Sequence, residues 1–192
     1  MLTLYFSPGA SSMAPHIALH EIGVPFESRP LSFARKETRT PEFLAINPAG
    51  QVPTLLIDGR PLTEVAGILF YLARQHPEAR LLPDDIEAQS HAVAWMSFIA
   101  STLHPARRQG QERATELYRL ADQLLGPREW ALGQYSIVDI HLFRLFWRFN
   151  ASLGAAPEAL PNLHAHHARM LARPAVQRTI EIERALGYEL PA

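Results

Sequence analysis

The sequence predicts a fold in two parts, an α/β half followed by an all-helical half. Three observations lead to this division. Short β-type runs alternate with helical patterns in the first part of the chain, residues 76–85 are rich in proline and aspartate, and no strand pattern follows them. We therefore expect domains at residues 1–76 and 87–192, joined by a linker at residues 77–86. Alternation of strands and helices in the first domain favours strands mixed with crossover helices.

The first domain has the predicted order β-α-β-α-β-β-α. Ser11 and Ser12 are candidate caps for its first helix, and Gly23 ends that helix as a C-terminal glycine. Asp58-Gly59 is a strong hairpin signal between the last two strands. The expected strands cover residues 2–6, 26–30, 54–57 and 61–62, and the expected helices cover residues 13–22, 41–46 and 65–75.

The second domain contains only helical patterns. The segment Ile137–Phe149 is so apolar that we expect it to be the buried central helix. Ser136 and Asp139 precede it as a capping box, in which each side chain binds the other residue's backbone N–H. The other expected helices cover residues 87–103, 112–125, 163–172 and 175–186.

Composition excludes several classes of protein. The chain of 192 residues is 47% hydrophobic, which is enough for a substantial core, and its formal net charge is -1. Such a charge argues against non-specific binding to nucleic acid or to a membrane surface. With no cysteine, disulfides, thiolate metal sites and a protein thiol nucleophile are excluded. The sequence starts without a signal-peptide pattern and has no apolar run of membrane-spanning length, so we expect a cytoplasmic protein.

The most informative motif is the segment Asn47–Leu55, followed by Leu62-Thr63-Glu64. Val52-Pro53 is a candidate cis peptide bond directly before a predicted strand. A cis proline there would expose the backbone N–H and C=O of Val52, and an extended peptide can pair with these groups as an added strand. The motif thus predicts a protein that holds a small peptide.

A set of short motifs is spread over almost the whole chain. They are Ser7–Ser12, His16, Asn47–Pro53, Leu62–Glu64, Tyr71-Leu72, Leu103-His104 and Ser136–Asp139. Together these motifs resemble those of the glutathione transferase superfamily, and most closely those of the bacterial beta class. The resemblance implies a thioredoxin-like N-terminal domain, a helical C-terminal domain, a homodimer, and the conjugation chemistry that this family uses in detoxification.

The resemblance also implies which residues bind glutathione. The Val52 backbone would pair with the cysteinyl unit, Glu64 and the Val65 backbone would bind the γ-glutamyl end, and Arg35 or Lys36 would pair with the glycyl carboxylate. His104 matches a histidine near the sulfur. The implied glutathione-binding residues are Lys36, Gln51, Val52, Pro53, Glu64 and Val65.

The sulfur end departs from the beta class, because Ser11 occupies the place of the class cysteine. The thiolate is the nucleophile in glutathione transfer, and a free thiol has a pKa near 8.5. One hydrogen bond to the charged sulfur would lower that pKa by about one to two units. Ser11 or Ser12, together with the N-terminus of the first helix, can therefore replace the cysteine. The candidate catalytic residues are Ser11, Ser12 and His104.

Two further departures leave alternatives open. Val65 replaces a serine that many relatives use for the γ-glutamyl carboxylate, and the segment from His104 to Gln111 is short. The main hypothesis is an enzyme that activates the glutathione thiolate for attack on a small hydrophobic electrophile. The alternatives are a glutathione-dependent isomerase of the maleylacetoacetate or maleylpyruvate type, and a non-catalytic glutathione- or ligand-binding protein.

Histidines four residues apart, His16 and His20, have the spacing of metal ligands. Without a third ligand in the pattern, packing is the better interpretation. We therefore expect glutathione as co-substrate and no metal.

Overall fold

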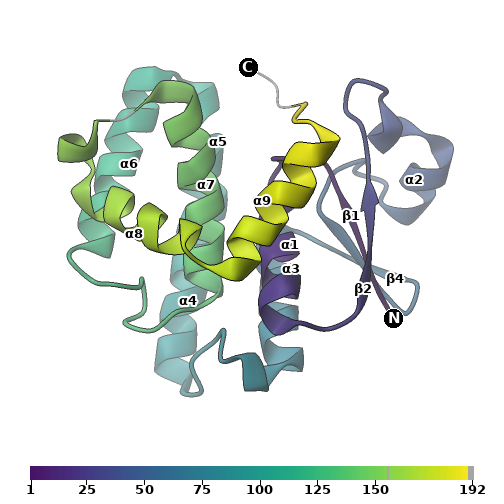
Figure 1. Ribbon diagram of the computed structural model, residues 1–192, viewed down its shortest axis with the longest axis horizontal. Helices are drawn as coiled ribbons and strands as arrows, with labels where there is room; N and C mark the ends of the chain where they lie inside the picture. The colour runs from purple at the N-terminus through teal and green to yellow at the C-terminus, as the bar shows by residue number, and fades with distance from the viewer. Residues whose placement is uncertain (155, 190–192) are drawn as a thin grey trace. The chain divides into compact units, whose positions relative to one another are not determined.

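The computed structural model describes residues 1–154 and 156–189, which form two compact units (Figure 1). The first unit combines residues 1–72 with the segment that begins at Pro174, and the second covers Ala73–Arg173. Within the described part of the chain, no helix is both long and apolar enough to cross a membrane.

The first unit contains a four-stranded sheet in the order β2-β1-β3-β4. Strand β1 pairs in parallel with β2, whereas β1 with β3 and β3 with β4 are antiparallel. This mixed sheet with crossover helices confirms the predicted thioredoxin-like half. The strands are β1 (Leu2–Phe6), β2 (Phe26–Pro30), β3 (Thr54–Ile57) and β4 (Arg60–Thr63).

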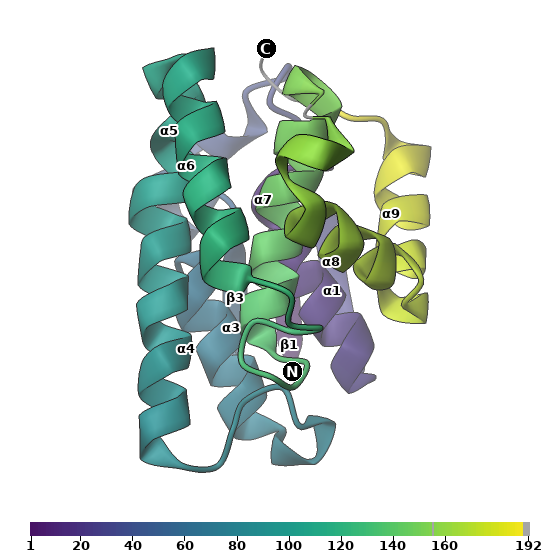
Figure 2. The ribbon, with the colours of Figure 1, turned by 90° about the vertical axis from the view of Figure 1, so that its left-hand side faces the viewer.

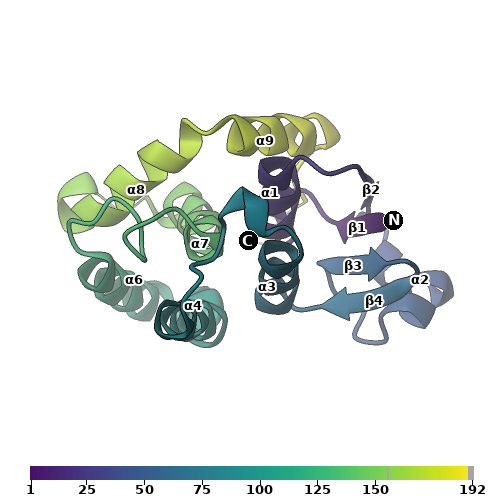
Figure 3. The same cartoon turned by 90° about the horizontal axis from the view of Figure 1, so that it is seen from below.

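Helices cover both faces of this sheet (Figure 3). Helices α1 (Met13–Ile22) and α3 (Val65–Gln75) lie on one face, and the short helix α2 (Pro41–Ile46) lies on the other. Gly23 ends α1 in the left-handed conformation with φ 76°, as predicted. The core between α1, α3 and the sheet is fully buried and apolar. It includes Leu4, Phe6, Ile17, Leu55, Ile68 and Leu69.

The last helix, α9 (Pro174–Leu186), packs against α1 and therefore belongs to the first unit. The predicted domain of residues 87–192 includes α9 by chain order, whereas packing groups this helix with the sheet. The domain limits themselves stay a prediction. Residues 155 and 190–192, which the predicted domain also covers, lie outside the described residues.

The second unit is helical, as predicted. Its main helices are α4 (Ile86–Phe98), α5 (His104–Ala106), α6 (Gln111–Leu125), α7 (Ile137–Leu153) and α8 (Pro161–Leu171). Helix α7 lies between α4 and α8 (Figure 2), and most of its apolar side chains are buried. The expected central helix is thus confirmed. The expected single helix over residues 87–103 is wrong in one respect, because α4 ends at Phe98 and a π-helical turn covers Ile99–Leu103.

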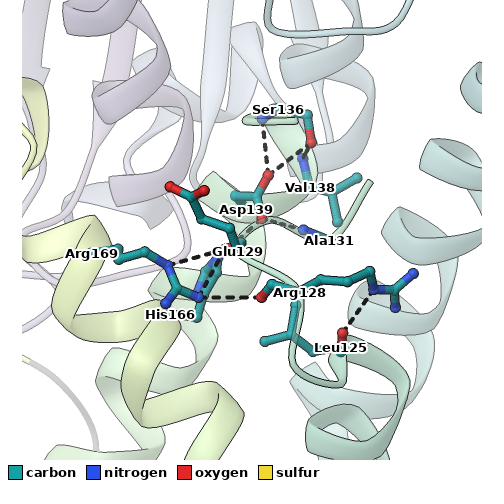
Figure 4. Close-up of polar contacts among 9 residues, drawn as sticks. All are labelled: Leu125, Arg128, Glu129, Ala131, Ser136, Val138, Asp139, His166 and Arg169. Carbon is teal, nitrogen blue, oxygen red and sulfur yellow. Dashed lines mark hydrogen bonds and ion pairs between the residues drawn. The ribbon is translucent and has the colours of Figure 1, made fainter. Parts of the chain in front are cut away.

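The predicted capping box at the start of α7 is present (Figure 4). The Asp139 carboxylate accepts hydrogen bonds from the Ser136 N–H at 2.9 Å and the Ser136 hydroxyl at 3.0 Å. It also accepts from the Ala131 N–H at 2.8 Å and lies 3.1 Å from His166 Nε2. These four residues, Ala131, Ser136, Asp139 and His166, form what we call the cap cluster. All are fully buried or nearly so, which makes the cluster a structural element.

Candidate functional site

Four chain segments leave the sheet at the same edge. In the strand register Tyr5 pairs with Thr54, Thr54 pairs with Thr63, and Phe6 pairs with Pro30. The end of β1, the start of β3, the end of β4 and the end of β2 therefore lie side by side. The loops that carry the predicted glutathione-binding residues begin or end at this edge.

The loop of residues 47–54, called the cis-proline loop below, is held by its own side chains. The Val52-Pro53 bond is cis, as predicted. The Asn47 amide nitrogen donates to the Gln51 carbonyl at 2.9 Å and to Thr54 Oγ1 at 3.0 Å, and Thr54 Oγ1 donates to the same carbonyl at 3.1 Å. Sequence reasoning assigned no role to Asn47 and Thr54, although an Asn at a loop start commonly organises the following turn.

Gly50 allows this loop to lie close to the preceding segment. Its φ is 60°, and a Cβ added there would lie 2.7 Å from the Thr38 carbonyl oxygen. Only glycine avoids both the left-handed strain and this overlap. Val52 is buried in a cluster with Tyr5, Ala10 and Phe43, whereas the Gln51 side chain is exposed. The loop thus has a fixed backbone and an accessible side chain.

The two serines before α1 have different environments. The Ser11 hydroxyl is partly buried and donates to the Val52 carbonyl at 3.2 Å, so it lies directly beside the cis-proline loop. The Ser12 hydroxyl is fully buried, accepts from the Ser7 N–H at 3.1 Å and donates to the Ser7 carbonyl at 3.2 Å. The predicted capping role of Ser12 is wrong, because its side chain makes no capping hydrogen bond. The hydroxyl binds back to Ser7 instead.

Glu64 and Val65 lie at the junction of β4 and α3. Glu64 has a φ of 66°, which is strained for a residue other than glycine, and it is exposed. Its carbonyl accepts the hydrogen bond of the Ile68 N–H at 3.0 Å, so it begins the helix. Strained residues of this kind concentrate at ligand-binding sites. The first backbone N–H groups of an α-helix, here including that of Val65, have no partner within the helix, and such a helix start can bind an anion.

The structure separates the two candidates for the glycyl carboxylate. The Arg35 guanidinium already binds the Glu37 carboxylate at 2.9 Å. Lys36 is exposed, and within the described residues its ammonium group makes no ion pair. Lys36 is therefore the better placed of the two for a ligand.

His104 belongs to the second unit, where it begins α5. Desolvation, with smaller contributions from the Arg144 and Arg108 charges, lowers the pKa of His104 below 6.5, although the residue is exposed. The neighbouring His141 is fully buried, and burial lowers its pKa to about 3. Both imidazoles are therefore neutral at pH 7, and the positive charge of Arg144 acts on both. Among the described residues, no group of three or more metal-ligating side chains occurs.

Comparison with known proteins identifies the family. The glutathione S-transferase N-terminal domain model matches residues 1–74, and the C-terminal domain model matches residues 86–174. Glutathione S-transferase GstA of Escherichia coli O157:H7 is 32% identical over 200 residues, which cover 95% of this chain and 98% of GstA. At lower identity, 27%, a maleylacetoacetate isomerase of Pseudomonas aeruginosa aligns with 77% of this chain and 82% of its own.

Solved structures agree with this match. A sphingomonad glutathione S-transferase complexed with glutathione superposes with a TM-score of 0.83 at 34% identity, covering 95% of this chain and 98% of that one. A bacterial beta class glutathione S-transferase of Sphingomonas chungbukensis gives 0.81 at 34% identity, with 94% and 98% covered. Together with the two-part fold and the loops at the sheet edge, these matches show that the chain belongs to the glutathione S-transferase family.

Proposed function

We propose that this chain is a glutathione transferase that binds glutathione at the loop edge of its sheet and activates the thiolate for attack on a small hydrophobic electrophile. One observation carries the proposal most directly. The Ser11 hydroxyl lies 3.2 Å from the Val52 carbonyl, which joins the residue at the class-cysteine position to the cis-proline loop. The glutathione complex of the sphingomonad relative supports the ligand.

The loops divide the tripeptide between them. The backbone of Val52 would pair with the cysteinyl unit as an added strand, and the exposed Gln51 side chain lies next to it. The α-carboxylate of the γ-glutamyl unit would accept from the first N–H groups of α3 at Val65, and Glu64 would bind the amino group. The Lys36 ammonium would pair with the glycyl carboxylate. Each charged group of glutathione thus has a partner of opposite charge or a donor.

We infer that Ser11, not Ser12, is the hydroxyl donor to sulfur. Ser12 is fully buried and already both donates to and accepts from Ser7, so it has no hydrogen left for a ligand. The Ser11 hydroxyl can exchange its 3.2 Å hydrogen bond to the Val52 carbonyl for a charge-assisted bond to a thiolate when the backbone of Val52 pairs with the ligand. Such a bond lowers the thiol pKa by about one to two units. His104 stays a catalytic candidate because it matches a histidine of the beta class, and a neutral imidazole is able to accept a proton.

A glutathione-dependent isomerase is the second candidate, because one observation favours it. The charges of Arg144 and Arg108 act on His104, and that of Arg107 acts on Arg148. Positive charge in this part of the second unit favours an anionic substrate such as an unsaturated acid. A carrier without turnover is a third reading, supported by Val65 in the place of the usual serine.

Family membership supports a proposal about assembly and location. We propose a homodimer in the cytoplasm, with roles in detoxification and without nucleic-acid or membrane partners. Sedimentation equilibrium over a range of protein concentrations measures the assembly state, and a monomer at all concentrations would contradict the dimer.

The decisive experiment measures the pKa of the thiol of bound glutathione. Glutathione added to the protein should give thiolate absorbance at a pH below the free thiol's pKa, and glutathione resin should retain the chain. Ser11→Ala should raise the bound thiol's pKa by about one unit, with Ser12→Ala as the matched control that leaves it unchanged. No retention and no thiolate absorbance would refute all glutathione readings. Conjugation of an aryl halide would identify a transferase, and isomerisation of a maleyl acid would identify an isomerase. Glutathione binding without either reaction would identify a carrier.

A further inference from the structure

A buried carboxylate on the last helix contacts the loop that precedes α1. Glu183 of α9 is fully buried, and its Oε2 accepts a hydrogen bond from the Gly9 N–H at 2.7 Å. Its Oε1 lies 2.9 Å from Nδ1 of His16, which is 1% exposed. Both contacts lie within the first compact unit. One carboxylate therefore binds two points of the chain, one before and one after the serines.

The segment between these two points carries the proposed sulfur-binding hydroxyl. Gly9 has a φ of 73° in the turn that the Ala10 N–H closes onto the Ser7 carbonyl at 3.0 Å. Ser11 follows two residues later, and His16 lies in the second turn of α1. With Gly9 and His16 both fixed by Glu183, the peptide units from Gly9 to Ser12 have little freedom to shift. The Ser11 hydroxyl is then held against the Val52 carbonyl.

The energetics argue against a passive packing role for this side chain. Burying an ionised carboxylate has an effective desolvation cost of several kcal/mol, and an apolar residue of similar volume would fill the same space without that cost. In the described part of the chain, the Gly9 N–H and the His16 ring both compensate this carboxylate. One of its oxygens is thus directed at the loop before α1, and the other at His16 within α1.

We propose that Glu183 is a positioning residue for the glutathione sulfur, acting through Gly9 and His16 on the Ser11 hydroxyl. This inference rests on the proposed function. It predicts a selective effect, because the cis-proline loop and Glu64, which hold the peptide part of glutathione, do not contact Glu183. Loss of the carboxylate should impair ionisation of the thiol far more than it weakens binding of the tripeptide.

The test compares Glu183→Ala, Glu183→Gln and the control Glu181→Ala, which removes an exposed carboxylate from the same helix. Glu183→Ala should raise the pKa of bound glutathione by about one unit, or lower turnover about tenfold at a pH below that pKa, while the Kd for glutathione changes less than threefold. Glu183→Gln should largely restore the wild-type value, because its amide oxygen accepts from Gly9 and its nitrogen donates to the other tautomer of His16. Glu181→Ala should match the wild type.

Hydrogen exchange of the ligand-free protein measures how rigid the loop before α1 is in the absence of glutathione. The amides of residues 8–12 should exchange faster in Glu183→Ala, and not in Glu181→Ala. Should Glu183→Ala fail to fold, Glu183→Asp replaces it, since the shorter carboxylate withdraws from Gly9 by one methylene and the same rise in thiol pKa is expected. A folded variant with the wild-type thiol pKa and loop exchange overturns the inference alone. A wild-type chain that neither binds nor ionises glutathione overturns the proposed function, and the role of Glu183 at the sulfur with it.

Discussion

The cis-proline loop and the cap cluster use polar groups in opposite ways. In the cap cluster, both oxygens of the Asp139 carboxylate lie within hydrogen-bonding distance of buried donors of the second unit. In the loop, the Asn47 and Thr54 side chains fix the backbone, but Gln51 and the nearby Glu64 and Lys36 remain exposed. Polar motifs therefore do not by themselves indicate a binding site. A motif whose polar groups all bind partners inside the protein stabilises the fold. A motif that fixes the backbone and leaves polar side chains exposed is suited to binding a ligand.

The largest expected effect is the loss of the cap. Asp139→Ala should lower the free energy of unfolding by about 3–5 kcal/mol, because the donors of Ser136, Ala131 and His166 would be buried without their acceptor. Urea unfolding measures this change. The control is Asp85→Ala, which removes an exposed cap of α4 and should cost only about 1 kcal/mol. Equal costs in the two variants would break the distinction between the buried and the exposed cap.

The second largest expected effect is a loss of stability in acid, which arises from a buried histidine close to the cap cluster. Burial lowers the pKa of His141, two residues after Asp139, to about 3, whereas the unfolded chain binds a proton near pH 6.5. Because the unfolded state binds more protons between these values, stability is full above pH 6.5 and falls as the pH decreases toward 3. At pH 5 this one group accounts for about 2 kcal/mol.

Unfolding free energies measured from pH 7 to pH 4.5 test this slope. His141→Gln should flatten it, whatever the variant's stability at pH 7, and the control His91→Gln replaces an exposed histidine and should not. An identical slope in His141→Gln and the wild type would show that His141 does not contribute.

The smallest effect is expected at Lys36, one of the exposed residues of the proposed glutathione site. Lys36→Ala should raise the Kd for glutathione up to about fivefold, the equivalent of an exposed ion pair, and change the unfolding free energy by less than about 0.5 kcal/mol. Lys36→Arg should restore binding. Because Lys36 is the only lysine in the sequence, reductive methylation places a single side-chain NMR probe at this position. A methyl resonance unmoved by glutathione would assign the glycyl carboxylate to another residue.

Local signals explain how much of the fold could be predicted. Gly23, Asp58-Gly59 and the Ser136–Asp139 box mark element ends through backbone conformation and capping, so the sequence locates them within a residue or two. The π-helical turn at Ile99–Leu103 leaves no such mark, because apolar periodicity continues through it. The end of α4 at Phe98 therefore has no local signal in the sequence.

The candidate site was predictable only in its loops. The cis-proline loop has a readable pattern, and the structure agrees with its cis bond. No sequence pattern predicts the contrast between Ser11 and Ser12, because adjacent serines differ only in the residues that the fold places around them. The Glu183 contact to His16 joins residues 167 positions apart, and no periodicity reports a pairing at that distance. Such contacts arise from tertiary packing, which one sequence does not encode in its local pattern.

The grouping of α9 with the sheet has a consequence during synthesis. Residues 73–173 are, in topological terms, an insertion between two pieces of one unit. On the ribosome the sheet emerges before residues 73–173 but lacks α9 until these residues have been made, when the inserted helical unit is already complete. A nascent or truncated chain that ends before Pro174 would leave His16 without the carboxylate it binds. The sequence order therefore makes a segment that is translated after the whole helical unit the one that completes the first unit.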